Sequence, residues 1–182
     1  MIILICAKAG AGKTKIAHAL IDHLPNTIIM SFADPLYEIH NITKEMLSSY
    51  GVELNNIERG LLIAIGEWGR KKDSRFWINL LNRKLCRFDG NIIIDDVRFP
   101  AELNAFPRAF KVKLEASLEC RLKRAGKPFD PNDETETSLN HLPNDVYDCI
   151  LDTENMSLES NVKYLLETLQ IWSQGPADHL LS

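Results

Sequence analysis

The sequence predicts an α/β protein built on a five-stranded parallel sheet with helices on both faces. Short apolar runs alternate along the chain with longer stretches in which apolar residues recur at helical spacing. The runs Ile2–Cys6 and Ile92–Ile94 are unbroken, which is typical of strands that are buried on both sides. The chain has 182 residues, of which 45% are hydrophobic and 25% charged, so we expect a single domain over residues 1–182.

Turn and capping residues divide the chain into its expected elements. Leu24-Pro25-Asn26 closes the first helix, Pro35 suits the first turn of the next, Gly51 ends that helix, and Ser117 is a good N-cap. We expect strands at residues 2–6, 27–32, 92–94, 109–114 and 149–151. We expect helices at residues 13–23, 34–50, 100–105, 117–124 and 158–172, and two more between Ile57 and Leu85.

Residues 125–144 interrupt this alternation. The segment holds one glycine, three prolines and many acidic and hydroxyl residues. Loops of this length are uncommon in compact domains and are often functional. We interpret the segment as a mobile lid, and a passive surface loop is the alternative.

The composition of the chain bears on its binding partners and its location. The net charge of −4 lacks the basic excess of proteins that wrap nucleic acid, so we expect no nucleic-acid partner, although a small anionic substrate can still be bound locally. The four cysteines have no zinc or redox spacing, and we expect free thiols in a reducing compartment. No apolar run reaches 18 residues and the start is unlike a signal peptide, so we expect no membrane segment and a cytoplasmic location. The sequence leaves a homodimer open.

The strongest signal is the segment that we call the phosphate loop, Ala7-Lys8-Ala9-Gly10-Ala11-Gly12-Lys13-Thr14. It matches the pattern G-x-x-x-x-G-K-[ST] at its last three positions and lies between a buried strand and an amphipathic helix, as the motif requires. Ala7 replaces the first glycine, which is tolerated if its φ is negative. The alternative is a small-residue turn that binds nothing. The motif predicts a P-loop NTPase-type three-layer sandwich.

The phosphate loop also predicts the ligands of the site. Backbone N–H groups at a helix N-terminus attract phosphates, so we expect ATP to bind there. Lys13 would bridge the β- and γ-phosphates, and the Thr14 hydroxyl would coordinate Mg²⁺. The nucleotide-binding residues are expected to be Ala9, Gly10, Ala11, Gly12, Lys13, Thr14 and Lys15.

Polar residues follow other strands at the edge where ligands bind in open parallel sheets. Either Asp95 or Asp96 fits the acidic partner of Mg²⁺, and the alternative is a carboxylate that caps a helix. Arg98 suits a phosphate, or else forms a surface ion pair. Asp34 could bind the substrate sugar, assist the attacking oxygen, or only cap the helix at Pro35.

Two further pairs of residues are candidates for the substrate site. Arg70 could bind the acceptor phosphate with Trp68 beside a base, and the alternatives are a solvated charge and a core tryptophan. Arg121 and Arg124 lie three residues apart on one helix face, directly before the lid. A closing lid would bring them to the transferred phosphate, and a solvated basic face is the alternative.

Taken together, these segments resemble the phage and bacterial deoxynucleoside monophosphate kinases, a branch of the P-loop nucleotide kinases. The matching segments run in the expected order over nearly the whole chain. They are Gly12-Lys13-Thr14, Phe32-Ala33-Asp34-Pro35-Leu36, Gly66-Glu67-Trp68-Gly69-Arg70, Asp95-Asp96-Val97-Arg98-Phe99-Pro100-Ala101-Glu102, the stretch Glu134–Ser138 and Asp148. Ala7 and Ala101 depart from the family pattern.

The resemblance implies transfer of the γ-phosphoryl group of ATP, with Mg²⁺, to a (deoxy)nucleoside monophosphate. It gives catalytic roles to Lys13, Arg121, Arg124 and Asp34, and metal binding to Thr14 with Asp95 or Asp96. It gives acceptor binding to Asp34, Trp68, Arg70, Arg98 and Glu102. Kinases of phosphomevalonate-like acceptors share a similar pattern. A nucleotide-dependent ATPase or switch and a non-catalytic nucleotide-binding module are the other hypotheses.

Overall fold

The computed structural model describes residues 1–54, 59–126 and 128–174. Its contacts divide the chain into two compact units. Unit 1 comprises residues 1–30 together with the chain from residue 90 onward, and unit 2 comprises residues 31–89. Ile57, the expected start of the third helix, lies outside the described residues.

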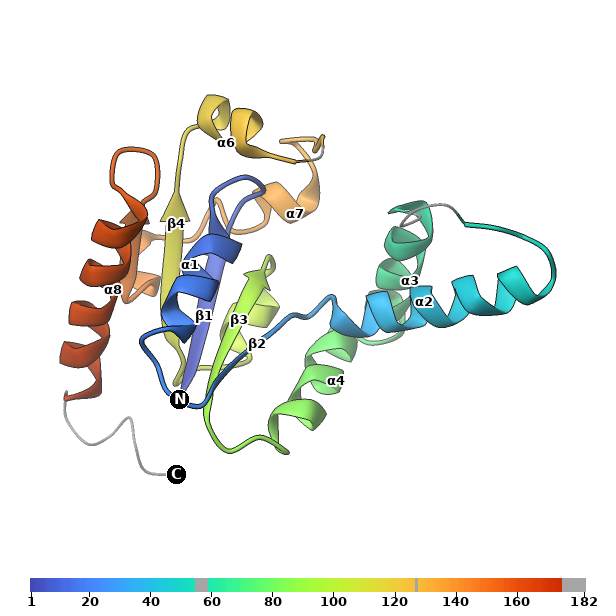
Figure 1. Ribbon diagram of the computed structural model, residues 1–182, viewed down its shortest axis with the longest axis horizontal. Helices are drawn as coiled ribbons and strands as arrows, with labels where there is room; N and C mark the ends of the chain where they lie inside the picture. The colour runs from blue at the N-terminus through green and yellow to red at the C-terminus, as the bar shows by residue number, and fades with distance from the viewer. Residues whose placement is uncertain (55–58, 127, 175–182) are drawn as a thin grey trace. The chain divides into compact units, whose positions relative to one another are not determined.

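Unit 1 is built on a five-stranded parallel sheet, which confirms the predicted fold class (Figure 1). The strand order β2-β3-β1-β4-β5 places β1 at the centre. Because all strands are parallel, their carboxyl ends meet at one edge of the sheet, where the phosphate loop begins. The strands are β1 (Ile2–Ala7), β2 (Thr27–Met30), β3 (Asn91–Val97), β4 (Phe110–Glu115) and β5 (Cys149–Asp152).

Two helices share one face of this sheet. They are α1 (Lys13–Ile21) and α8 (Leu158–Ser173), both close to their predicted bounds. Ile16 of α1 and Leu165 of α8 pack against Ile5 of β1 in the main hydrophobic core. These apolar contacts fix the start of α1, and with it the phosphate loop, against the central strand.

The opposite face carries a different set of residues. Cys6 alternates with Ile5 along β1, so it points to this second face. The short helix α5 (Pro100–Asn104) brings Glu102 near the Cys6 thiol, and the 3₁₀ turn η1 (Asn144–Val146) precedes Tyr147, which shares a cavity with Cys6. All four cysteines are free thiols, as the sequence predicts.

Two short helices lie beyond the carboxyl ends of the strands (Figure 1). Helix α6 (Leu118–Arg124) starts at Ser117, whose hydroxyl accepts a hydrogen bond from the Cys120 N–H at 3.2 Å, as the capping prediction requires. The expected lid, residues 125–144, contains α7 (Glu134–Thr137) and ends where η1 begins. Its closing motion stays a prediction.

Unit 2 consists of three helices, α2 (Asp34–Ser49), α3 (Arg59–Lys72) and α4 (Phe76–Leu85), where the sequence predicts them. Trp77 is buried, and its indole N–H donates to the Gly66 carbonyl at 3.0 Å. A Cβ on Gly69 would lie 2.6 Å from the Trp77 ring, so glycine is needed for α3 to pack against this tryptophan.

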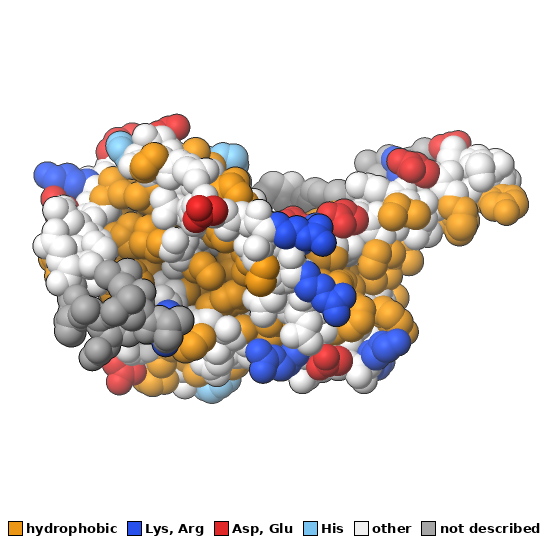
Figure 2. Space-filling model, turned by 90° about the horizontal axis from the view of Figure 1, so that it is seen from below, with side chains coloured by type: hydrophobic (Ala, Val, Ile, Leu, Met, Phe, Trp, Pro, Cys, Tyr) orange, Lys and Arg blue, Asp and Glu red, His pale blue; other side chains and the backbone are white. Residues whose placement is uncertain are grey.

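Helix α2 also presents apolar side chains to solvent. Ile42, Met46 and Tyr50 are exposed, and their spacing of four residues places them along one side of the helix. Apolar side chains are visible over this part of the surface on the right of Figure 2. The homodimer considered from the sequence stays a prediction. Within the described ranges, no helix combines the length and apolar character needed to cross a bilayer.

Candidate functional site

The phosphate loop has the backbone conformation that its glycines allow. Gly10 has φ of 76° and Gly12 has φ of 91°, both in the left-handed region that residues with a Cβ rarely adopt. Across the described residues, Asn26 is the only non-glycine with a positive φ. Ala7 therefore has an ordinary φ, which confirms the condition under which alanine can replace the first glycine of the motif.

Gly10 is required for a second reason, which is its close approach to α6. A Cβ at this position would lie 2.3 Å from the backbone oxygen of Arg121. No side-chain rotation can relieve a contact with a backbone carbonyl. The phosphate loop therefore packs directly on α6, and this contact holds Arg121 beside the loop.

Three donor groups fix the rest of the loop. The Ala11 N–H donates to the Lys8 carbonyl at 3.2 Å, and the Thr153 hydroxyl donates to the Ala11 carbonyl at 2.9 Å. The Ala9 N–H donates to both carboxylate oxygens of Glu136, at 3.1 and 3.0 Å. The loop is thus tied to the end of β5 through Thr153 and to the lid through Glu136.

A cavity of about 600 Å³ adjoins the helical side of the phosphate loop. This volume lies within the roughly 300–1,000 Å³ that small-molecule sites usually have. The first turn of α1 leaves N–H groups without an intrahelical partner, and these favour an anion. The lining includes Gly10, Gly12, Lys13, Thr14, Lys15, Arg124 and several residues between Thr153 and Asn161.

The predicted nucleotide-binding residues therefore fall into two groups. Gly10, Gly12, Lys13, Thr14 and Lys15 share this cavity with Arg124. Ala11 is buried, and the Ala9 N–H is bonded to Glu136. The loop glycines, the ammonium group of Lys13 and the hydroxyl of Thr14 fit ATP and Mg²⁺ chemically.

The two candidate aspartates for Mg²⁺ lie at an irregularity of the sheet. Leu4 pairs with Ile94 and Cys6 with Val97, so Asp95 and Asp96 together stand opposite one residue of β1. Such a bulge changes the direction of side chains and is common beside active sites. Asp96 is close enough to Glu102 for its charge to raise the pKa of that carboxyl.

A magnesium site of this type needs few protein ligands. Across the described part of the chain, no group of three or more His, Cys, Asp and Glu side chains is arranged to hold a metal. Mg²⁺ in phosphate sites commonly uses one or two protein oxygens and takes its other ligands from phosphates and water. The pairing of Thr14 with one of the two aspartates stays a prediction.

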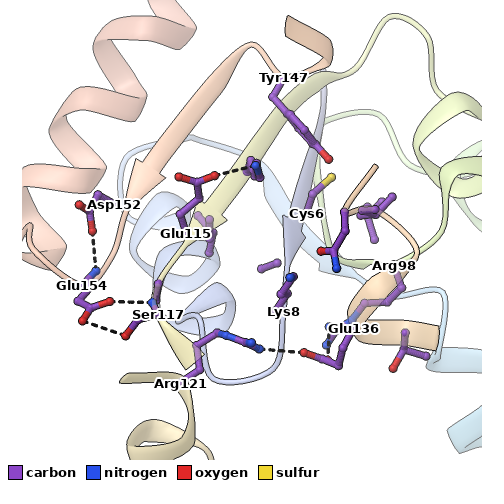
Figure 3. A pocket seen from close by; sticks show the side chains of 18 of the residues that line it. Cys6, Lys8, Arg98, Glu115, Ser117, Arg121, Glu136, Tyr147, Asp152 and Glu154 are labelled. Atoms are coloured by element: carbon purple, nitrogen blue, oxygen red, sulfur yellow. Dashed lines mark hydrogen bonds and ion pairs between the residues drawn. The ribbon is translucent and has the colours of Figure 1, made fainter. Parts of the chain in front are cut away.

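A second cavity, of about 470 Å³, lies on the face of the sheet that carries Cys6 (Figure 3). Its polar lining comes from segments that are far apart in the sequence. Figure 3 shows Lys8, Arg98, Arg121 and Glu136 gathered along one side of this cavity. The acidic side chains elsewhere in the cavity have partners of their own. Glu115 forms an ion pair with Lys113. Glu154 accepts a hydrogen bond from the Ser117 hydroxyl, and Asp152 accepts one from the Asn155 side chain.

Glu136 is the centre of this group. Its carboxylate is 5% exposed and accepts hydrogen bonds from the Nη1 of Arg98 at 2.9 Å and from the Nη1 of Arg121 at 3.0 Å, besides that from Ala9. Arg121 also donates to the Ala9 carbonyl at 3.2 Å and lies over the Phe129 ring. One carboxylate therefore connects β3, the phosphate loop, α6 and α7.

Glu102 supports Arg98 through the backbone. Its carboxylate accepts hydrogen bonds from the N–H of Arg98 at 2.7 Å and from the N–H of Phe99 at 3.0 Å, which caps the start of α5. Burial, as the largest cause, raises the pKa of Glu102 to about 7 although these N–H groups lower it. The structure gives Glu102 a capping role, and its expected contact with a substrate stays a prediction.

Lys8 brings a further cation to the cavity. Burial and then the charge of Arg121 lower the pKa of its ammonium group, while Glu136 raises it. In the described residues the Lys8 ammonium group makes no ion pair. The group formed by Lys8, Arg98, Arg121 and Glu136 therefore has an excess of positive charge.

The other predicted acceptor residues belong to unit 2. The Asp34 carboxylate accepts a hydrogen bond from the Ser31 N–H at 2.9 Å and lies in the first turn of α2, whose N-cap position is Ala33 rather than Asp34. Trp68 is 53% exposed and is therefore no core tryptophan, and Arg70 lies near Gly66 on the same helix. Roles for Asp34, Trp68 and Arg70 in substrate binding stay predictions.

Sequence reasoning missed two members of the site. Glu136 appeared only within an acidic stretch, where a buried carboxylate cannot be told from its exposed neighbour Glu134. Lys8 occupies a variable position of the motif. No spacing rule singles out either residue, because the hydrogen-bond partners of Glu136 lie 15, 38 and 127 residues away in the sequence and Lys8 joins them only through the fold.

Comparison with known proteins identifies the architecture. No family model matches the sequence, and no curated protein matches it. The fold is similar to shikimate kinase from Aquifex aeolicus, with a TM-score of 0.56, 16% identity, and coverage of 97% of this chain and 100% of the other. It is also similar to the tunicamycin resistance protein of Deinococcus radiodurans, with a TM-score of 0.55, 19% identity, and coverage of 92% and 94%.

A third solved structure has the same architecture. It is a gluconokinase from Sinorhizobium meliloti, with a TM-score of 0.50, 20% identity, and coverage of 96% of this chain and 97% of the other. At these identities the likeness establishes the fold. The chain therefore has the α/β fold of P-loop kinases, with a five-stranded parallel sheet and helices around it.

Proposed function

We propose that this protein is an ATP-dependent kinase that phosphorylates a small phosphorylated acceptor, and that the acceptor is a (deoxy)nucleoside monophosphate. The observation that supports this most is the position of two cavities at the phosphate loop. One contains Lys13, Thr14 and Arg124, and the other contains Arg98 and Arg121. Such a pair suits a donor phosphate and a second, separate anion.

The charge of the group around Glu136, on one side of the second cavity, favours a phosphorylated acceptor. Three cations, Lys8, Arg98 and Arg121, face one carboxylate, Glu136, which leaves the group with an excess of two positive charges. A phosphomonoester carries about −1.5 to −2 at neutral pH. Shikimate and gluconate, which the names of two similar structures mention, would not balance this charge so closely.

In the proposed reaction the protein mainly positions groups and stabilises charge. Lys13 neutralises charge on the donor phosphates, and Arg121 and Arg124 approach the transferred group from α6. Thr14 with Asp95 or Asp96 would hold Mg²⁺, which would offset negative charge on the phosphates of ATP. Asp34 is the proposed partner of the acceptor's attacking oxygen, and Trp68, Arg70, Arg98 and Glu102 are the proposed acceptor residues.

The test is an ADP-release assay with ATP and Mg²⁺. The acceptor panel contains each deoxynucleoside and ribonucleoside monophosphate, phosphomevalonate, shikimate and gluconate. Stimulation by nucleotides supports the proposal and names the base and sugar. Stimulation by phosphomevalonate alone keeps a kinase of a phosphorylated acceptor but rejects the nucleotide. ADP release that no acceptor stimulates points to an ATPase or switch, and ATP binding without turnover points to a binding module.

A further inference from the structure

Glu136 is a buried carboxylate that makes its contacts with groups of the candidate site. It accepts hydrogen bonds from one N–H of the phosphate loop and from two guanidinium groups, all between 2.9 and 3.1 Å. Charge-assisted bonds of this length are among the stronger interactions in proteins. Glu136 therefore restricts the orientation of Arg98 and Arg121 before any substrate arrives.

The two arginines are not fully used by these contacts. A guanidinium group has five N–H donors in a fixed planar fork, and Glu136 engages the Nη1 of each arginine. Among the described residues the buried Nε–H of Arg121 has no hydrogen-bond partner, while Arg121 itself is 6% exposed and lines the second cavity. Buried donors without partners are rare, and each calls for an explanation such as a bound water or ion.

The charges around Glu136 also favour an anionic ligand. Glu136 neutralises one of the three cations around it, and the charge of Arg121 lowers the pKa of Lys8. Elsewhere in the cavity Glu115 forms an ion pair with Lys113, whereas the hydrogen-bond partners of Glu154 and Asp152, Ser117 and Asn155, are uncharged. The group of Lys8, Arg98, Arg121 and Glu136 thus has the donors and the local excess of positive charge that suit one dianionic phosphate group, while the acids on the other side of the cavity balance the charge of the whole lining.

We propose that Glu136 is a positioning residue for the acceptor. Its carboxylate fixes Arg98 and Arg121 so that their remaining N–H groups, together with the ammonium group of Lys8, bind the acceptor's phosphate in the second cavity. This inference rests on the proposed function for the identity of the ligand. It adds Glu136 and Lys8 to the acceptor site and gives Arg121 a contact with the acceptor's phosphate besides its proposed role at the transferred group.

The direction in which Glu136→Gln changes the affinity for phosphate separates a positioning role of Glu136 from plain charge repulsion. The probe is inorganic phosphate, titrated by calorimetry into protein whose phosphate loop is filled with Mg²⁺ and the ATP analogue AMP-PNP. If Glu136 only repels or competes with phosphate, Glu136→Gln will bind phosphate more tightly. If Glu136 holds the arginines, the same variant will bind phosphate at least about tenfold more weakly, since charge-assisted contacts are lost.

A matched control comes from the same short helix. Glu134 is exposed and carries the same side chain two residues earlier, so Glu134→Gln should leave phosphate binding within about twofold. Lys8→Ala should weaken phosphate binding as well. In an Arg98→Ala background the effect of Glu136→Gln should shrink, because one of the groups that Glu136 holds is absent.

Affinity for AMP-PNP and the melting temperature, measured on the same samples, separate positioning from loss of structure. Positioning predicts that phosphate affinity falls by at least about threefold more than AMP-PNP affinity, which the bond from the Ala9 N–H to Glu136 can also affect, whereas general loosening lowers both affinities equally together with the melting temperature. Tighter phosphate binding by Glu136→Gln, an equal loss for phosphate and AMP-PNP, or no phosphate binding by the wild type would each overturn the inference. A wild type that binds phosphate but phosphorylates no acceptor would reject the proposed function and leave the phosphate site standing.

Discussion

The glycines of the phosphate loop offer a direct test of how this site is built. Gly10 and Gly12 both have a positive φ, at 76° and 91°. A Cβ on Gly10 would meet the Arg121 backbone oxygen at 2.3 Å and its carbonyl carbon and Cα at 2.9 Å, whereas a Cβ on Gly12 would meet nothing within 4 Å. Alanine at either position therefore introduces backbone strain, and alanine at Gly10 adds a steric clash.

The expected loss of unfolding free energy follows from the backbone strain and the steric clash. Left-handed backbone costs an alanine about 1–2 kcal/mol, which is the full expected loss of unfolding free energy for Gly12→Ala. The clash has no side chain that can move away, so Gly10→Ala should lose a further 1–3 kcal/mol or so, as overpacking does. In a chain of 182 residues this difference between the two variants corresponds to about 2–12 °C in melting temperature.

Urea unfolding of the wild type and both variants, followed by circular dichroism, measures the difference. A larger loss for Gly10→Ala indicates that the phosphate loop packs on α6 as the structure describes. Equal losses for the two variants would refute the reasoning, since they would mean that Arg121 is not in contact with the loop.

Three other predictions concern activity and pH. Lys13→Ala should lower kcat at least about 100-fold with an unchanged melting temperature. The control Lys163→Ala, at an exposed lysine of α8, should leave kcat unchanged. Near-normal turnover by folded Lys13→Ala would contradict the role of Lys13 at the donor phosphates. Arg98→Ala should mainly raise the KM of the acceptor at saturating ATP, and an unchanged KM would remove Arg98 from the acceptor site. Burial raises the pKa of Glu102 from 4.5 to about 7, so between these pH values the folded chain holds a proton that the unfolded chain has released. The unfolding free energy of the wild type relative to Glu102→Gln should therefore fall by about 3 kcal/mol as pH rises from 4.5 to 7, and a pH-independent difference would argue against this buried acid.

The fold could be predicted from the sequence because its signals are local. Unbroken apolar runs predict β1 and β3, helical periodicity predicts α1 and α8, and the serine at position 117 predicts the start of α6. Each signal depends on neighbouring residues alone. The phosphate loop is local in the same way, since eight consecutive residues carry both its motif and its turn.

Other features depend on contacts between distant segments. The bulge that places Asp95 and Asp96 opposite one residue of β1 is a property of strand pairing, and no residue type in the sequence predicts it. The close approach of Gly10 to Arg121 joins positions more than 100 residues apart. The sequence treats Glu134 and Glu136 alike, and only the packing of α7 exposes one and buries the other.

The sequence by itself thus determined the α/β architecture, the phosphate loop and the residues Lys13, Thr14, Arg98 and Arg121 as candidates. The tertiary structure decided which of these face a common cavity, and it added Glu136 and Lys8. The physical reason is that a charged side chain takes its role from its partners and its burial. Both are set by long-range packing and not by the residues next to it in the chain.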